Sequence, residues 1–190
     1  MILHRIFCVI FLVIVQALSG CSSDFSQPFP MPLIPLSQEV KKVGGAPEIY
    51  LQEIKDLRES KVFLEHDNMK YQTHADIGPV AREALSKAFE KQGYKYSNTA
   101  KFIFKTDILK WHAKIEEGFL SIATAEAEVA MALFNRQGQK MYSGKYRGVA
   151  TLESVIYNND DIAEILGASM GAAILQLSHD QKLESLLTKK

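Results

Sequence analysis

The strongest pattern in the chain is an alternation of apolar and polar positions over residues 122–134. Alanine, valine, methionine and leucine hold one set of alternate positions, while threonine and glutamate hold much of the other. A period of two buries one face of a β-strand, and it is kept here for too long to suit an alanine-rich helix. A glycine-containing turn leads to a return strand over residues 141–152, and residues 101–113 read as a strand before it. The pattern therefore predicts a three-stranded meander.

Helical periods flank this meander on both sides. Apolar residues recur at steps of three and four over residues 80–89, where Asp76 or Gly78 can begin a helix and Gly93 can end it. A second long helix is predicted over residues 162–177, followed by a short leucine-containing helix. Three polar residues can cap the start of the second helix: Asn158, Asn159 and Asp160.

Shorter apolar runs complete the predicted domain. Residues 49–54 are compatible with a strand, and residues 62–64 with a short second strand. The predicted order is strand, helix, three-stranded meander, helix. We therefore expect an α+β fold, with a mostly antiparallel sheet of about four strands and two main helices packed on one face. The other face of the sheet is expected to carry charge.

The first twenty residues have the layout of a secretory signal peptide. A basic start is followed by an apolar run that is shorter than the ~20 residues needed to span a membrane. The run ends in Leu18-Ser19-Gly20-Cys21, which is a lipobox. We expect cleavage before Cys21, which then carries diacylglycerol and an N-acyl chain such as palmitate. Such acyl chains anchor a protein lastingly in a bilayer.

The residue after the cysteine bears on the compartment. Position 22 is a serine and not an aspartate. In bacterial lipoproteins generally an aspartate there suggests retention in the inner membrane. By that resemblance, we expect a lipid-anchored protein of the outer membrane that faces the periplasm.

Residues 21–47 read as a lipidated tether before a single periplasmic domain at residues 48–190. The stretch contains five of the six prolines of the chain, which favour extended, semi-stiff segments. A plain spacer would not need the apolar residues that interrupt it, so part of the stretch can instead dock on a partner or on its own domain. These residues are Phe25, Phe29, Met31, Leu33 and Ile34.

Composition excludes some classes of function. Lysine and arginine total 22, as do aspartate and glutamate, so there is no electrostatic reason to expect nucleic acid as a partner. Cys8 leaves with the signal peptide and Cys21 carries the lipid, which leaves no pair for an intramolecular disulfide. No phosphate loop or dinucleotide-binding pattern is present, and we expect no cofactor.

One motif with catalytic associations is Gly167-Ala168-Ser169-Met170-Gly171, which matches G-x-S-x-G. That motif needs a sharp turn between a strand and a helix, whereas the helical period here runs through it. We interpret its small residues as a close-packing surface of a helix and expect no enzymatic activity.

Two other groups of polar residues are weaker candidates for chemistry. Alternation places Glu126 and Glu128 on the solvent face of a strand, where they cannot serve as a desolvated acid and base. Two loop pairs could offer metal ligands, but their spacing matches no known site, so no metal is expected. These pairs are His66-Asp67 and His74-Asp76.

The lipobox and four further stretches form a set of core positions: FEKQGY at 89–94, IATAEAEV at 122–129, RQGQKM at 136–141 with Tyr146-Arg147 beyond it, and DIA at 161–163. Over residues 48–187 this set resembles the YajG-type family of small bacterial lipoproteins. The resemblance implies no catalytic residues, because no activity is established for that family. It implies a small α/β domain like those that envelope lipoproteins use as docking modules in assembly machines and in the activation of cell-wall synthases.

The functional expectation is a non-enzymatic docking or accessory factor for another envelope protein complex. An exposed apolar patch on the free face of the sheet would support it, and the candidate partner-facing residues are Tyr142, Tyr146 and Phe134. The alternative is a module that binds an envelope ligand such as a lipid, a glycan or a peptidoglycan fragment. A deep cavity in place of a filled core would favour that alternative.

Overall fold

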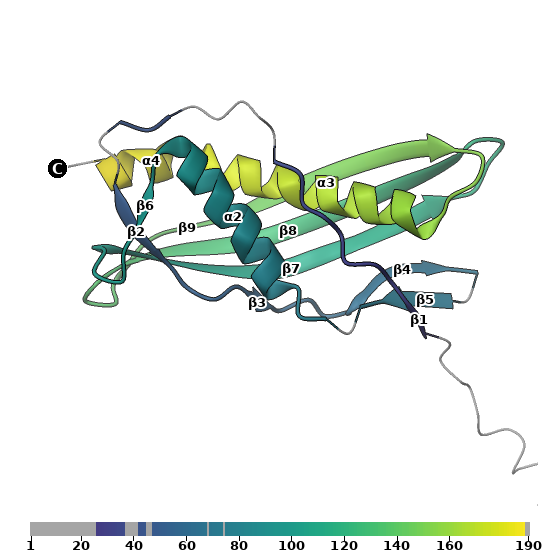
Figure 1. Cartoon of the computed structure of the whole chain (residues 1–190), viewed down its shortest axis with the longest axis horizontal. Coiled ribbons are helices and arrows are strands. Elements are labelled where there is room, and N and C mark those ends of the chain that lie inside the picture. The colour runs from purple at the N-terminus through teal and green to yellow at the C-terminus, as the bar shows by residue number, and fades with distance from the viewer. Residues whose placement is uncertain (1–25, 37–41, 45–46, 68, 74, 189–190) are drawn as a thin grey trace, which may run out of the picture.

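Three antiparallel strands of 15 residues each form the centre of the molecule (Figure 1). The computed structural model describes residues 26–36, 42–44, 47–67, 69–73 and 75–188. The central strands are β7 (Phe102–Glu116), β8 (Ser121–Asn135) and β9 (Lys140–Ser154), and each pairs with the next in antiparallel register. They lie where the sequence predicts them, and each runs a few residues further.

Six short strands extend the sheet from β7, and five of their six pairings are parallel. Two of these strands pair directly with β7 near its start, and a third joins it near its far end. Two of the remaining strands each pair with a strand of this group, and the last one pairs with one of those two. In chain order they are β1 (Ser26–Pro28), β2 (Glu48–Leu51), β3 (Lys55–Asp56), β4 (Val62–His66), β5 (Met69–Gln72) and β6 (Lys95–Tyr96).

The predicted fold class is therefore wrong. Within the described residues the sheet is mixed and has nine strands, in place of a mostly antiparallel sheet of about four. Three of the short strands join β7 in parallel, and strands of two to five residues are too short for a period of two to reveal such pairing. The sequence predicts no strand in residues 55–60 or directly after His66, but these stretches contain β3 and β5.

Helices α2 (Gly78–Gln92), α3 (Asn159–Ser178) and α4 (Gln181–Thr188) cover one face of the sheet (Figure 1). Gly93 ends α2 in the left-handed conformation at φ 95°, as the sequence predicts. Asn158 caps α3 through a reciprocal capping box with Asp161. The helices thus begin and end close to the predicted positions.

The core lies between the helices and the long strands. Trp111 on β7 is buried there, and its indole nitrogen donates a hydrogen bond to the Leu166 carbonyl of α3 at 2.9 Å. A Cβ at Gly148 would overlap the Ser169 carbonyl oxygen, so this glycine on β9 allows the backbone of α3 to approach the sheet.

Residues 26–36, which we call the strap, pack on the domain. Phe29 is buried in an aromatic cluster, with ring centroids 5.8 Å from Phe63 and 6.4 Å from Tyr71. Further along the strap, the carbonyl oxygens of Leu33 and Pro35 lie where side chains on Gly167 and Gly171 of α3 would stand. This part of the proline-rich stretch therefore docks on its own domain, and the hydrophobic core includes residues that precede Glu48.

Candidate docking surface

The predicted lipid site, Cys21 with Leu18, Ser19 and Gly20, lies outside the described residues, which begin at Ser26. None of the helices in the described part of the chain is long and apolar enough to cross a bilayer. The surface of the described domain is therefore where candidate partner sites can be sought.

Two of the three predicted partner-facing residues lie on the helix-covered face and not on the free face. Tyr146 is 5% exposed, and its hydroxyl donates to Asp180 at 2.7 Å, while Tyr142 donates to the same carboxylate oxygen at 2.6 Å. The β8–β9 register explains this placement, because Tyr146 stands opposite the buried Val129. The two tyrosines therefore support the junction of α3 and α4 and cannot form an exposed patch.

Asp180 acts as the polar centre of that junction. Its other oxygen accepts from the backbone N–H groups of Lys182 and Leu183 at the start of α4. Burial by itself would raise the pKa of Asp180, but the two tyrosine hydroxyls and these N–H groups hold the pKa below its usual value. Burial and the hydrogen bond to Asp180 raise the pKa of Tyr146.

The third predicted residue, Phe134, is half-buried, and the Lys105 ammonium lies 4.8 Å from its ring centroid. The middle of the free face carries charge, as the sequence predicts, and cross-strand ion pairs stand where an apolar patch would have supported docking. Glu126 binds Lys110 at 3.0 Å and Arg147 at 2.7 Å, and a second pair joins Glu128 to Lys145 at 3.2 Å. Ion pairs therefore occupy the middle of this face.

Ser169 lies within α3, is fully buried, and donates its hydroxyl to the Leu166 carbonyl at 2.8 Å. The G-x-S-x-G stretch is therefore part of a helix, as predicted, and not a nucleophile elbow. The two glycines face the strap, while Gly148 provides the close approach to the sheet.

The residues considered as possible metal ligands are only partly brought together. His74 lies outside the described residues, and Asp76 accepts the Gly78 N–H at the start of α2. His66 and Asp67 approach Glu117, with ligand atoms all within 4.8 Å of one another. Asp67 and Glu117 are exposed to water, which competes for a metal, so the cluster carries no metal assignment.

An open groove runs between α2 and residues 53–57, with a volume of about 810 Å³. Leu57 stands on the ridge between this groove and a second hollow beside β7, and 53% of its surface is exposed. Most of the side chains along the first groove are charged, with both signs present: Glu53, Lys55, Asp56, Asp76, Arg82, Glu83, Lys87 and Glu90.

A buried arginine fixes the strand segment that carries Leu57. Arg58 donates two hydrogen bonds to Asp56, at 3.0 and 3.1 Å, and a third to the Trp111 carbonyl at 3.1 Å. Burial would raise the pKa of Asp56, but the hydrogen bonds from Arg58 and Lys61 lower it. Sequence reasoning missed this group, because a single arginine after Asp-Leu carries no pattern.

Exposed apolar side chains gather at one end of the molecule, in the loops after β7 and after β9 and at the start of β8. The two loops meet because Ser121 pairs with Ser154. Phe119 is 99% exposed and Ile156 is 80% exposed. We call this set the apolar loop end: Phe119, Leu120, Ile122, Val155 and Ile156. In the sequence, the signal for this surface is an apolar pair in each of two loops, Phe119-Leu120 and Val155-Ile156. Only the strand register shows that the two pairs are neighbours.

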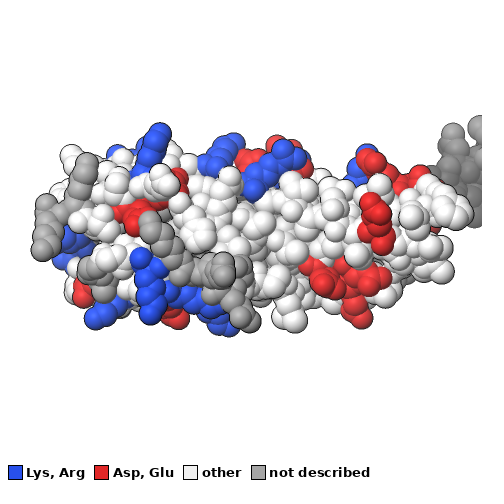
Figure 2. Space-filling model, turned by 90° about the horizontal axis from the view of Figure 1, so that it is seen from above, with Lys and Arg blue, Asp and Glu red and all other residues white. Residues whose placement is uncertain are grey.

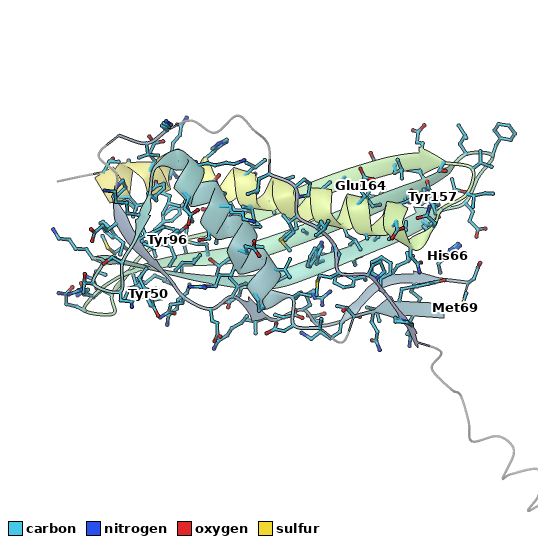
Figure 3. All side chains as sticks on the ribbon, viewed as in Figure 1. Tyr50, His66, Met69, Tyr96, Tyr157 and Glu164 are labelled. Atoms are coloured by element: carbon cyan, nitrogen blue, oxygen red, sulfur yellow. The ribbon has the colours of Figure 1, made fainter. Side chains whose placement is uncertain are left out.

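The base of the apolar loop end is firmly held. The Tyr157 hydroxyl accepts the Ala123 N–H at 2.9 Å, and the carbonyl oxygens of Leu152 and Ser121 are both in position to accept its single hydrogen. Figure 3 places Tyr157 at the same end of the molecule as His66 and Met69 of the β4–β5 hairpin. The exposed side chains therefore stand beside a base that is tied together by hydrogen bonds.

Comparison with protein families decides the classification. A family described as an uncharacterised lipoprotein matches residues 52–188, most of the described domain. The chain belongs to this lipoprotein family. Membership implies association with the cell envelope. No curated protein matches the sequence.

A solved structure shows the fold of this lipoprotein in another bacterial protein. The crystal structure of protein XCC0632 from Xanthomonas campestris aligns with a TM-score of 0.57 at 10% identity, over 84% of this chain and 97% of that one. A minor lipoprotein from Acinetobacter baumannii aligns with a TM-score of 0.48 at 12% identity, over 74% of this chain and 94% of that one. At such identities the first likeness shows the fold alone.

Proposed function

We propose that this lipoprotein is a non-enzymatic accessory or docking factor for another envelope protein complex. In this proposal a lipid on Cys21 holds it at the outer membrane, facing the periplasm. The finer kinship with YajG-type lipoproteins belongs to the same proposal. Membership in a lipoprotein family supports the anchored location, and the surface of the domain supports docking.

The observation that carries the proposal is the groove with Leu57 on its ridge. Interfaces between proteins that also exist apart are about as apolar as the rest of the surface, with a few large anchors among charged rim residues. The groove fits that description, because one half-exposed leucine stands among side chains of both signs.

The ligand-binding alternative has less support. Small ligands usually bind in enclosed, mostly apolar pockets, whereas this groove is open and charged. The space between the helices and the long strands is filled by buried side chains such as Phe89, Phe104, Trp111 and Leu166. The described residues therefore favour a protein surface as the occupant of the groove.

Site-specific photo-crosslinking in intact cells tests the proposal. A photoreactive amino acid replaces Leu57 in the full lipidated chain, and the matched control carries it at Val149 on the free face, which is 48% exposed. We expect one discrete envelope protein to crosslink from position 57 and not from position 149. Leu57→Asp should remove the same partner from a pull-down, while Val149→Asp should retain it.

Equal crosslinking from both positions, or crosslinks only to abundant outer-membrane proteins, would contradict the docking function. In that case the groove would have no specific protein partner, and ligand screening on the domain would follow. A Cys21→Ser chain provides the comparison for the anchor, since loss of the lipid should weaken recovery of the partner.

A further inference from the structure

The apolar loop end shares one end of the molecule with β1, the first described element of the chain (Figure 1). Ser26, the first described residue, pairs with Lys70 of β5, next to the turn of the β4–β5 hairpin. That turn contains Asp67, whose carboxylate lies within 4.8 Å of a Glu117 oxygen. Glu117 begins the loop that carries Phe119. The hairpin, the start of the strap and the apolar loop end are therefore neighbours.

The strap makes the connection to the membrane short. Cys21 precedes Ser26 by five residues, and an extended chain spans about 3.3–3.6 Å per residue, so the link reaches at most about 18 Å. Had the whole proline-rich stretch been a spacer, the domain could have stood much further away. Because Phe29 is buried in the domain, a lipid on Cys21 holds this particular end close to the bilayer surface.

The side chains at this end suit the interfacial region of a bilayer. Exposed apolar clusters mark protein or membrane contacts, and phenylalanine, leucine and similar side chains enter the boundary between headgroups and acyl chains. We propose that the apolar loop end inserts into the headgroup layer of the membrane that holds the lipid anchor. It thereby fixes the orientation of the domain as a second membrane contact.

The surrounding charges specify the kind of lipid surface. Residues 116–122 and 153–161, which form the two loops and their flanks, contain five carboxylates and no lysine or arginine. Figure 2 shows acidic side chains predominating at this end in the face it displays. Carboxylates are repelled by anionic lipids, so the apolar loop end should prefer zwitterionic headgroups. Its binding should also resist salt, because apolar burial drives it.

Tryptophan fluorescence in reconstituted vesicles tests the insertion. The full lipidated chain carries Phe119→Trp, and its matched control carries Met141→Trp, which is 41% exposed and lies in β9 next to the β8–β9 turn. The native Trp111 is buried and gives both variants the same background. In phosphatidylcholine vesicles we expect blue-shifted emission and strong quenching by brominated lipid for Phe119→Trp alone. Adding phosphatidylglycerol should reduce that quenching.

The quenching measurement can also exclude the insertion. Mass spectrometry first confirms a lipid on Cys21 in the reconstituted sample. If Phe119→Trp is then quenched by aqueous iodide and not by brominated lipid, the insertion is excluded. The same holds if Phe119→Trp and Met141→Trp respond alike. The crosslinking at Leu57 does not depend on this outcome, so the two proposals fail or succeed separately.

Discussion

At the scale of single residues, Asp180 predicts that the folded domain loses stability in acid. Its folded pKa lies below the ordinary value of 3.8, so the stability it contributes is present above that value and is lost as pH falls through the folded pKa. Asp180→Asn should lower the free energy of unfolding by about 1–3 kcal/mol at neutral pH, because two tyrosine hydroxyls lose a charged acceptor. Urea unfolding measured across pH checks this.

The direction in which this stability difference changes with pH provides the control. The difference between the native chain and Asp180→Asn should shrink as the pH falls below the ordinary pKa of an aspartate. Tyr146→Phe, which removes one of the two hydroxyl donors, should show part of the same loss. A difference that stays constant from neutral to acidic pH would mean that the carboxylate charge at position 180 is unimportant.

At the scale of elements, the contact between the strap and α3 depends on glycine. Gly171→Ala improves helix propensity by about 1 kcal/mol, but its Cβ would overlap the Pro35 carbonyl oxygen. A backbone atom cannot move aside as a flexible side chain does, so we expect the strap to detach locally at a net cost of about 1–3 kcal/mol. Limited proteolysis should then cleave the strap faster than in the native chain.

Gly44→Ala is the matched control, because no atom lies within 4 Å of the added Cβ. It should leave both the cleavage pattern and the unfolding midpoint unchanged. Unaltered protection of the strap in Gly171→Ala would show that the strap does not require close backbone contact with α3.

The helices and long strands show which elements sequence patterns can predict. Regular periods over ten or more residues located β8, α2 and α3, and Gly93 marked a helix end through its left-handed conformation. The same reasoning could not place Tyr146. Alternation says which residues share a face of a strand, but the face that the helices cover is fixed only by the register with β8.

Sequence patterns missed the shorter features for a different reason. A two-residue strand such as β3 has no internal period, and its existence depends on the edge of β7 that it joins. Proline content favoured a spacer for the strap, whereas the aromatic pocket that receives Phe29 is assembled from residues far along the chain. The apolar loop end was likewise hidden until two distant loops were brought together.

At the scale of the whole molecule, the boundary of the folded unit can be tested by truncation. A chain that begins at Glu48 loses the buried Phe29 and the strap residues packed on the core. Removing a buried phenylalanine side chain costs about 3–5 kcal/mol, so the melting temperature should fall by about 10 °C or more relative to a chain that begins at Ser26. Differential scanning calorimetry of the two chains measures the difference.

Phe29→Ala in the longer chain separates the side chain from the rest of the strap. It should account for a large part of the loss, because its ring packs against both Phe63 and Tyr71. Equal melting temperatures for the two truncated chains would mean that residues 26–36 add nothing to the stability of the domain.

The strap also sets an order of events during export. It enters the envelope near the front of the chain, but its partners on α3 follow more than 130 residues later, as the separation of Leu33 and Gly167 shows. Contacts so distant in sequence form late, after most of the chain is available. On the proposal of a lipid on Cys21, the stretch beside that residue therefore stays accessible while the signal is cut and the acyl chains are attached. The part of the domain that emerges first is among the last to close, and on the same proposal the anchor is in place before it closes.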